Sequence, residues 1–575
     1  IHLCCGICLL FFVKATLACT SAGKAELPKG LTPGIVALFT ALLWIAFPIN
    51  TGAVTYIVQR MTSLAVMFYI LCLCLYVLAR LEFQRQRFSA KSIVLFVGCA
   101  LAGLCAFATK ENTATLPIVI LLYEFFFFQD MKIRITQRKA LWFTGAVVLF
   151  AGIALFYLGE TPLDRILSAY NRREFTLGER VMTEWRIIIY YISLFFWPAP
   201  WRLNLDYDYP LSYHIANPST TLIALLALLS MIALAVLIAR RHRILAFCLL
   251  WFFINLAIES SFIGIELIYE HRTYLPFMML CLMAVLLVAK ISSRSRMPIA
   301  ILCILILGFS VWTFQRNQTW RDPVTFWMDG IKKSPLDARL YANAGHVFME
   351  QDSFEEAIPY FKSALSLWSV KQEKRYGAKS HFELGVAYTK AGQQEKAISH
   401  YQEAVALNPG YAKAHYNLGM MLSDKGETQL AALHYQTAIK IDPAYAEAHV
   451  NLGNIYARKG NYETAAAHFQ AALKHNPRKK EAHFNLAMAY VLRKDYQKGA
   501  QVFEQMLAYM PDNPNIYYNI ACMHALQNHT DKAVSWLKQA VAHGYEKWEY
   551  LKNDKDLENI RQTEYYKNLI KSVSD

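Results

Sequence analysis

The chain has 575 residues, of which 55% are hydrophobic and 14% aromatic, and its mean hydropathy is positive. It is too long for a single core and too apolar for an ordinary pair of soluble domains, so the composition indicates a membrane protein. The formal net charge of +15 comes largely from short basic clusters between apolar runs. That distribution is typical of membrane topology and argues against nucleic-acid binding.

Residues 1–315 carry apolar runs that predict membrane helices. The runs lie at 1–18, 34–50, 61–79, 92–109, 114–128, 140–158, 219–239, 244–262, 274–290 and 297–315. A shorter run at 187–197 ends in Pro198 and Pro200, and we interpret it as re-entrant or interfacial. We therefore expect ten or eleven membrane helices, which form a polytopic domain at 1–315.

Lysine and arginine gather in four short loops, which predicts that these loops are cytoplasmic. The loops lie at 80–91, 132–139, 240–243 and 290–296. Alternation then places residues 316–575 on the extracytoplasmic side, periplasmic or lumenal. It also makes residue 1 emerge on that side with no start methionine before it, so we expect a truncated chain whose first helix and first external loop are missing.

A period of 34 residues runs through the second half of the chain. It appears in Pro409, Pro443, Pro477 and Pro511, in Gly385, Gly419, Gly453, Ala487 and Ala521, and in Tyr401, Tyr435, Phe469 and Phe503. Small residues let two helices approach closely, and aromatic residues fill the gap between them. The period and motif are those of the tetratricopeptide repeat. We expect six repeats within an α-solenoid at 316–546, a lone helix at 321–334 before them, and a capping segment at 547–575.

One asparagine recurs two residues before the small residue of most repeats. The members are Asn343, Asn417, Asn451, Asn485 and Asn519, with Glu383 interrupting the series. An amide both donates and accepts hydrogen bonds, so stacked amides on a concave surface can hold an extended peptide by its backbone. This resembles the asparagine ladder of the O-GlcNAc transferase superhelix. The alternative is that asparagine is simply common at this position.

Histidine also recurs every 34 residues, at His381, His415, His449 and His483. Repeats stack about 10 Å apart, as packed helices do, which is too far for these imidazoles to share one metal ion at about 2 Å. We therefore expect the histidines to pack between repeats, and we predict no metal site.

Ionisable residues at membrane depth gather on the predicted outer side of the first domain. They include Arg60, Lys110, Glu111, Glu266, Glu270, His271 and Arg272. Cations beside carboxylates under aromatic side chains suit a phosphate-bearing lipid: the cations hold the phosphate, and a carboxylate accepts a hydroxyl proton. We assign Arg60, Lys110 and Arg272 to a donor phosphate, and Glu111, Glu266, Glu270 and His271 to polar support. The alternative is that these side chains pair structurally between helices.

Several motifs of the first half carry a family resemblance. They are Trp44-Ile-Ala-Phe-Pro-Ile-Asn-Thr-Gly-Ala-Val-Thr-Tyr-Ile-Val-Gln-Arg60, Thr109-Lys-Glu111, Leu116-Pro117 and Tyr123-Glu124. With repeats after the last apolar run, the chain resembles the transmembrane-and-tetratricopeptide-repeat proteins of the protein O-mannosyltransferase-like group of GT-C glycosyltransferases. The resemblance implies polyprenyl-phosphate-linked sugars as donors and an acidic catalytic residue in the first external loop. By the topology above, that residue lies upstream of Ile1, and we assign no catalytic residue here.

We therefore expect the intact protein to transfer a sugar from a polyprenyl-phosphate donor to Ser or Thr hydroxyls of a protein, with inversion at the anomeric carbon. The acceptor would lie as an extended peptide along the repeats, which would feed it toward the cavity. No cofactor besides the lipid-linked sugar is implied. Two alternatives remain: a membrane-anchored repeat scaffold without enzymatic activity, and a ligase for lipid-linked oligosaccharides.

Overall fold

The computed structural model describes residues 1–19, 31–55, 59–129, 131–132, 168, 170, 173, 175–261, 263–291, 296–368 and 376–574. Over these ranges the protein is helical and has no strand, apart from one isolated bridge between His214 and Asn217. The predicted all-α class is confirmed. The chain forms two compact units, Ile1–Val347 and Phe348–Asp575.

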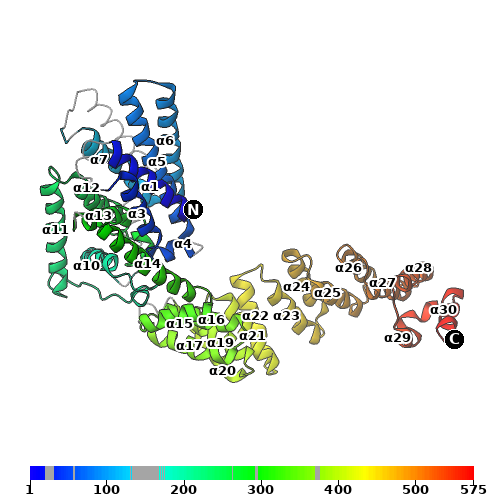
Figure 1. Ribbon diagram of the computed structural model, residues 1–575. Helices are drawn as coiled ribbons and strands as arrows, with labels where there is room; N and C mark the ends of the chain where they lie inside the picture. The colour runs from blue at the N-terminus through cyan, green and yellow to red at the C-terminus, as the bar shows by residue number, and fades with distance from the viewer. Residues whose placement is uncertain are drawn as a thin grey trace. The chain divides into compact units, whose positions relative to one another are not determined.

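The first unit (Figure 1) begins with a series of helices. They are α1 (His2–Cys19), α3 (Pro33–Ile45), η1 (Pro48–Asn50), α4 (Thr51–Thr55), α5 (Arg60–Arg85), α6 (Ala90–Thr109), η3 (Glu111–Thr115), α7 (Leu116–Tyr123) and η4 (Glu124–Phe128). The unit continues with α10 (Leu177–Phe196), η5 (Pro200–Arg202), α11 (Thr220–Ile238), α12 (Arg243–Leu256), η6 (Glu270–Thr273), α13 (Pro276–Ile291), α14 (Arg296–Thr319) and α15 (Pro323–Lys333).

Fewer of these helices than predicted are long and apolar enough to cross a membrane. Five qualify within the described ranges, or six if α3 and the bent segment Pro48–Thr55 form one span. Three further apolar helices are shorter, at His2–Ala18, Arg243–Leu256 and Pro276–Ile291. This count covers the described residues only, so the number of ten or eleven membrane helices stays a prediction. The predicted run at 140–158 lies outside the described residues.

The core of the first unit is built mainly by α1, α3, α5, α12 and α13. Helix α5 packs along α6 and α1, and α13 packs against α3 and α12. Trp44 and Trp251 are fully buried at its centre. Their indole N–H groups donate to the carbonyls of Tyr274 and Leu275, 3.0 and 3.1 Å away. These bonds satisfy buried donors and tie the start of α13 to α3 and α12.

The second unit contains most of the repeat array. The first repeat helix starts at Ala338, in the last residues of the first unit. The first repeat holds α16 (Ala338–Glu350) and α17 (Phe354–Leu367). The next five hold α19 (Ala378–Lys390) with α20 (Gln394–Leu407), α21 (Ala412–Asp424) with α22 (Thr428–Ile441), α23 (Ala446–Arg458) with α24 (Tyr462–His475), α25 (Lys480–Leu492) with α26 (Tyr496–Leu507), and α27 (Pro514–Leu526) with α28 (Thr530–Ala542). The tail forms α29 (Trp548–Asn553), η8 (Lys555–Ile560) and α30 (Glu564–Ser574).

The small residues do permit close helix packing inside the repeats. A Cβ added at Gly453 would lie 2.6 Å from a ring atom of Phe469, and one at Gly385 would lie 2.5 Å from the ring of Tyr401. Such distances are well inside van der Waals contact, so the aromatic rings occupy the space that a larger residue would need. The 34-residue pattern therefore records direct contact between the two helices of a repeat.

The repeated histidines contact the second helix of their own repeat, and three of them also contact the proline turn that ends the preceding repeat, so the predicted packing between repeats is only part of their role. His381 pairs with His400, His415 with His434, and His449 with His468, with Nδ1 atoms 3.0 to 3.1 Å apart. The second histidines of the pairs, on the second helices, also recur every 34 residues. His483 has no such partner within the described part of the chain, because Val502 occupies the equivalent position.

Candidate functional site

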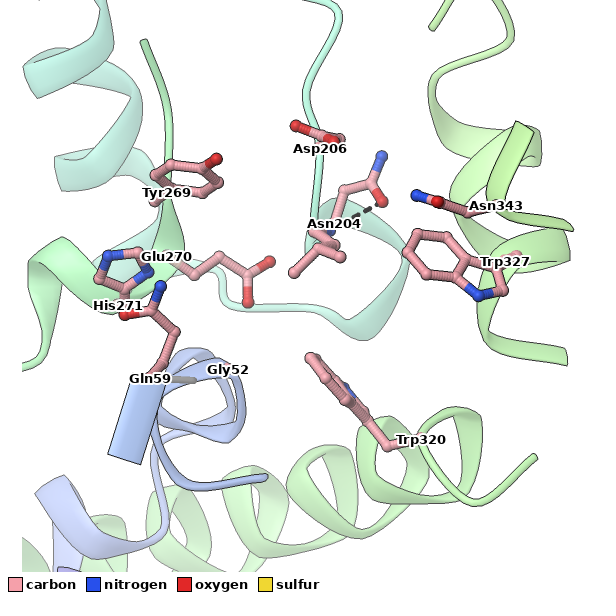
Figure 2. A pocket seen from close by; sticks show the side chains of 11 residues that line it. Gly52, Gln59, Asn204, Asp206, Tyr269, Glu270, His271, Trp320, Trp327 and Asn343 are labelled. Atoms are coloured by element: carbon pink, nitrogen blue, oxygen red, sulfur yellow. Dashed lines mark hydrogen bonds between the residues drawn. The ribbon is translucent and has the colours of Figure 1, made fainter. Parts of the chain in front are cut away.

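A cavity of about 300 Å³ lies in the first unit, where side chains from five separate segments meet. Its lining residues are Gly52, Gln59, Asn204, Leu205, Asp206, Tyr269, Glu270, His271, Trp320, Trp327 and Asn343. Figure 2 shows Glu270 reaching inward from one side, with Trp320, Trp327 and Asn343 on the other. Two carboxylates, three carboxamides and aromatic rings thus surround one space.

Prolines and short helices turn the chain toward this cavity. Helix α10 ends before Pro198 and Pro200, whose fixed φ angles turn the chain into the segment at 203–208. Pro48 bends the segment after α3 by 54°, which leads into α4 and Gly52. The one-turn helix η6 holds Glu270 and His271 just before α13. The site therefore lies where membrane-facing helices end.

Glu270 is the most enclosed carboxylate of the cavity. The Tyr207 hydroxyl donates to its Oε1 over 2.9 Å, and an Arg316 nitrogen lies 3.8 Å from the same atom. A Cβ placed on Gly52 would lie 3.5 Å from the other oxygen, so the glycine makes room for it. Burial raises the pKa of Glu270, whereas the positive charge of Arg316 and the hydrogen bond from Tyr207 act to lower it.

Asp206 is the second carboxylate of the cavity, and α16 supplies its partner. The Arg339 guanidinium donates to Asp206 over 3.0 Å and to Glu266 over 2.9 Å, and Asp337 anchors it at 3.4 Å. Burial raises the pKa of Asp206 to about 6, although the positive charge of Arg339 opposes the shift. Asp206 is therefore an ionised hydrogen-bond acceptor at neutral pH and titrates just below it.

His271 is a neutral group of the cavity wall. Burial lowers its pKa well below the ordinary value, and the nearby positive charges of Lys110 and Arg272 lower it further. Its ring stacks on Tyr269, with centroids 5.1 Å apart. A neutral imidazole offers one donor and one acceptor, so His271 adds hydrogen bonding without positive charge.

Only part of the predicted polar cluster comes together in this cavity. Glu270 and His271 line it, as does Gln59, the residue before Arg60. Glu266 lies outside and forms ion pairs with Arg173 and Arg339. These ion pairs fit the structural alternative for Glu266.

Two of the three predicted phosphate ligands have structural partners. Buried Arg272 donates to the Glu266 carbonyl and, over 2.6 Å, to the Leu267 carbonyl; it also lies 3.6 Å from Glu184. Lys110 lies 3.3 Å from a Glu259 oxygen. These contacts hold Glu259 and the segment at 263–272 against neighbouring helices.

The other two predicted residues of this region are exposed. Arg60 is the first residue of α5, and Glu111 begins η3. Neither forms an ion pair within the described ranges. Arg60 therefore keeps a guanidinium open to an anion at a helix N-terminus, where backbone N–H groups also favour negative charge.

The five asparagines of the predicted ladder divide between two places. Asn343 lines the cavity of the first unit, and the other four belong to the second unit. Asn417 donates to Tyr401 over 3.3 Å, and Asn485 donates to the Asn454 side chain over 2.8 Å. Part of the donor capacity of the ladder is thus used inside the array, while side-chain oxygens can still accept.

Asn204, Asp206, Trp320 and Trp327 line the site but do not belong to the predicted phosphate ligands or supporting residues. The tryptophans come from the end of α14 and from α15, and the other two residues come from the segment after α10. Asp206 lies in a tyrosine-rich stretch of the sequence, and no periodicity links it to Glu270. The cavity requires the segment at 203–208 to lie beside η6, which a linear pattern does not reveal.

One further cluster has metal-ligating side chains, in the C-terminal cap. Ligand atoms of Cys522, Asp554 and Asp556 lie within 4.8 Å of one another, the one such trio found within the described ranges. Tyr518 donates to Asp554 over 2.5 Å, and the Cys522 thiol donates to the same oxygen over 3.7 Å. This hydrogen bonding joins α27 to η8 and accounts for the cluster structurally.

Comparison with known families identifies the repeats. Models of the tetratricopeptide repeat match residues 336–409, 400–432, 419–460, 450–514 and 514–542. The array is made of tetratricopeptide repeats. The matched residues cover the segment from α16 to α28, and they agree with the predicted start and period of the repeats.

Curated relatives confirm the predicted resemblance. Protein O-mannosyl-transferase Tmtc3 of Drosophila melanogaster is 30% identical over 199 residues, which cover 33% of this chain and 21% of that protein. Human protein O-mannosyl-transferase TMTC3 is 30% identical over 143 residues, 24% of this chain and 15% of that protein. Mouse protein O-mannosyl-transferase TMTC1 is 24% identical over 206 residues, 33% of this chain and 22% of that protein. The matches thus span about a fifth of the length of these relatives or less.

Solved structures with similarity to this chain are repeat proteins. YrrB, described as a tetratricopeptide-repeat protein with an unusual peptide-binding site, is 20% identical, with a TM-score of 0.28 and coverage of 36% of this chain and 97% of its own. MamA of Desulfovibrio magneticus is 23% identical, with a TM-score of 0.27 and coverage of 30% and 93%.

Proposed function

We propose that this protein is a membrane glycosyltransferase that moves a sugar from a polyprenyl-phosphate donor to Ser or Thr hydroxyls of a protein held by the tetratricopeptide repeats. The observation that carries the proposal is the composition of the cavity. Relatives named protein O-mannosyl-transferases support the same class of reaction.

The cavity has the chemistry of a sugar site. A pyranose has apolar C–H faces and a rim of hydroxyls, so it needs aromatic surfaces together with several hydrogen-bond acceptors and donors. Trp320 and Trp327 supply indole surfaces, and Asp206 and Glu270 supply carboxylates. Asn343 adds an amide that can both donate and accept. A cavity of about 300 Å³ falls within the range of small-ligand sites.

The donor phosphate would lie outside this cavity, beside Arg60. Among the described lining residues none is a lysine or arginine, so an anionic phosphate has no cation within the cavity itself. Arg60 directly follows Gln59, a lining residue, and is exposed at the N-terminus of α5. We assign the phosphate to this helix end and the sugar to the cavity beyond Gln59.

The acceptor would be an extended segment in the repeat groove. Asn417, Asn451, Asn485 and Asn519 project from the first helices of successive repeats. Their side-chain oxygens suit backbone N–H groups, so binding would depend little on acceptor sequence.

The test is donor binding to the whole protein in lipid nanodiscs, followed by tryptophan fluorescence. Binding of a polyprenyl-phosphate-linked mannose should change the emission of the cavity indoles, and Trp327→Phe should reduce that change. Arg60→Ala should weaken binding by about tenfold, as loss of a charge-assisted contact predicts. Arg85→Ala is the matched control, because Arg85 is an exposed arginine at the other end of α5.

The two components of the donor can be separated. Free polyprenyl phosphate should bind less tightly than the mannose-linked lipid and should not respond to Trp327→Phe. If neither lipid bound while acceptor peptides still did, the enzyme proposal would be wrong and the repeat scaffold would be favoured. Equal affinities of Arg60→Ala and the unsubstituted protein would remove Arg60 from the phosphate site.

A further inference from the structure

The first helix of the fifth repeat carries an exposed apolar stripe. Phe484, Met488 and Leu492 are spaced by four residues along α25 and are 46%, 36% and 53% exposed. Residues at this spacing share one helix face. At the equivalent positions of the next repeat, Tyr518 and Cys522 are buried. An apolar face that the following repeat does not cover is available to a ligand.

A polar helix face lies across a cavity from this stripe. A cavity of about 380 Å³ lies between Met488 and Leu492 of α25 and Asn454 and Arg458 of α23, with Phe469 of α24 at its base. Asn454 and Arg458 precede Met488 and Leu492 by 34 residues each, so the same register positions form both walls. One wall can take a hydrocarbon side chain, and the other can take polar or acidic groups.

The two amides of this cavity, one from each wall, match a peptide unit. The Asn485 amide donates to the Asn454 oxygen over 2.8 Å, which orients both side chains. The Asn454 N–H₂ group and the Asn485 oxygen then remain as one donor and one acceptor. A backbone carbonyl and N–H need such a pair. This complementarity favours a peptide over a lipid tail, which has no hydrogen-bonding groups.

Arg458 determines the charge of the occupant. It is exposed one turn beyond Asn454 and forms no ion pair with the residues that the structure describes. The equivalent position of the next repeat holds Leu492, so this register position is charged on one wall of the cavity only. An unpaired guanidinium at the rim of an apolar cavity attracts a carboxylate next to the buried side chain.

We propose that this cavity, formed by Asn454, Arg458, Phe469, Asn485, Met488 and Leu492, is a specificity pocket. It takes a large aliphatic residue flanked by acidic residues in an extended peptide. The inference rests on the proposed function, in which the repeats hold such a peptide. It adds that the groove selects for sequence at this one position, whereas the asparagine ladder does not.

The experiment measures fluorescence anisotropy of four labelled peptides with the whole protein in lipid nanodiscs. The parent peptide is Ser-Gly-Glu-Leu-Glu-Gly-Ser, and the others replace Leu by Ser, both Glu by Gln, or all three residues. Replacing Leu should weaken binding by about tenfold, as loss of an apolar contact predicts. Replacing both Glu should weaken it by about two- to fivefold at low salt.

Protein variants connect each effect to one wall of the pocket. Leu492→Ala with Met488→Ala should abolish the preference for Leu but keep the preference for Glu, and Arg458→Gln should do the reverse. Leu433→Ala is the matched control, because Leu433 is a leucine on α22 that is 55% exposed. It should leave all four affinities unchanged.

The possible failures are distinguishable. Equal binding of all four peptides would overturn the pocket and leave the peptide-holding groove intact. Absence of binding by every peptide would overturn both the pocket and the peptide-holding part of the proposed function. A preference for Leu that survives the double alanine variant would place the apolar site elsewhere and overturn this assignment.

Discussion

Asp206 and Glu270 show how burial and partners set the properties of single residues in the cavity. Both carboxylates are drawn from water, which disfavours their charged forms, and each has an arginine that opposes the effect. Asp206 has the closer cation, Arg339 at 3.0 Å. Because Arg339 and Asn343 both lie on α16, the first repeat helix contributes both an ion-pair partner and a lining residue to the sugar site.

Donor binding should depend on the ionisation of Asp206. The pKa of Asp206 is raised to about 6, so the side chain is ionised at pH 7 and becomes protonated as the pH falls through that value. An ionised acceptor bonds sugar hydroxyls more strongly than a protonated one, and the difference is worth about five- to tenfold in affinity. We therefore expect the affinity for lipid-linked mannose to be highest above about pH 6 and to fall below it.

Substitution separates Asp206 from other titrating groups. Asp206→Asn should bind more weakly at neutral pH and lose this pH dependence. Asp208→Asn should behave like the unsubstituted protein, because Asp208 is exposed and does not line the cavity. Fluorescence titration across the range decides the matter, and an unchanged pH profile in Asp206→Asn would contradict the assignment.

At the scale of elements, the paired histidines join the two helices of three successive repeats. The Nε2 of His415 lies 3.2 Å from the Pro409 carbonyl, and that of His449 lies 3.3 Å from the Pro443 carbonyl. Each Nε2 therefore carries the proton, and the neutral ring accepts at Nδ1 from its partner on the next helix. Protonation of both rings would turn two N–H groups toward each other at about 3 Å, which removes the bond and adds repulsion.

The paired repeats should lose stability in mild acid. Burial lowers the pKa of His400 to about 4, with help from the charges of His381 and Lys362 and against Glu403. The pKa values of His434 and His468 are also lowered by burial and by their partners. The unfolded state therefore binds more protons below about pH 6.5, so stability is full above that pH and falls toward pH 4.

Hydrogen exchange of the whole protein, corrected for intrinsic rates, measures this effect helix by helix. Protection of α19 to α24 should fall between about pH 7 and about pH 5. Helices α25 and α26 are an internal control, because His483 has no histidine partner there. Replacing His400, His434 and His468 by Asn keeps a donor near the Nδ1 position but removes the titration of these three rings. An acid effect of undiminished size in that variant would show that these three rings are not its source.

At the scale of the molecule, the chain combines helices long enough to cross a membrane with a soluble type of repeat array. Five candidate spans lie in the first unit, and two of them, α5 and α14, have an end next to the lining residues Gln59 and Trp320. The basic loop between α5 and α6 remains the strongest indicator of sidedness. The extracytoplasmic location of the repeats follows from it as a prediction.

Cysteine labelling in intact cells tests this sidedness. In a background in which the exposed Cys4, Cys105 and Cys303 are replaced by Ser, Gln86→Cys should resist a membrane-impermeant thiol reagent until the cells are permeabilised. Asp512→Cys, in an exposed turn of the array, should react at once. Reaction of Gln86→Cys from outside would reverse the topology.

The sequence alone was enough to predict the class of the molecule and the architecture of its repeats. Repeats depend on contacts between residues close in the chain, such as Gly453 with Phe469, so the 34-residue period contains most of the information. Apolar runs likewise predicted a membrane-facing half, because crossing a membrane requires local composition. Local composition did not show where helices bend, as the segment Pro48–Thr55 does after α3.

Only the tertiary structure decided which polar residues share a cavity. Asp206, Glu270, Trp320 and Asn343 come from segments far apart in the chain, and no period links them. Arg272 and Lys110 resembled ligands in the sequence, but folding gave them buried carbonyls and carboxylates as partners. A charged side chain is available to a substrate only when the fold leaves it without such partners, and that depends on long-range packing that local patterns do not encode.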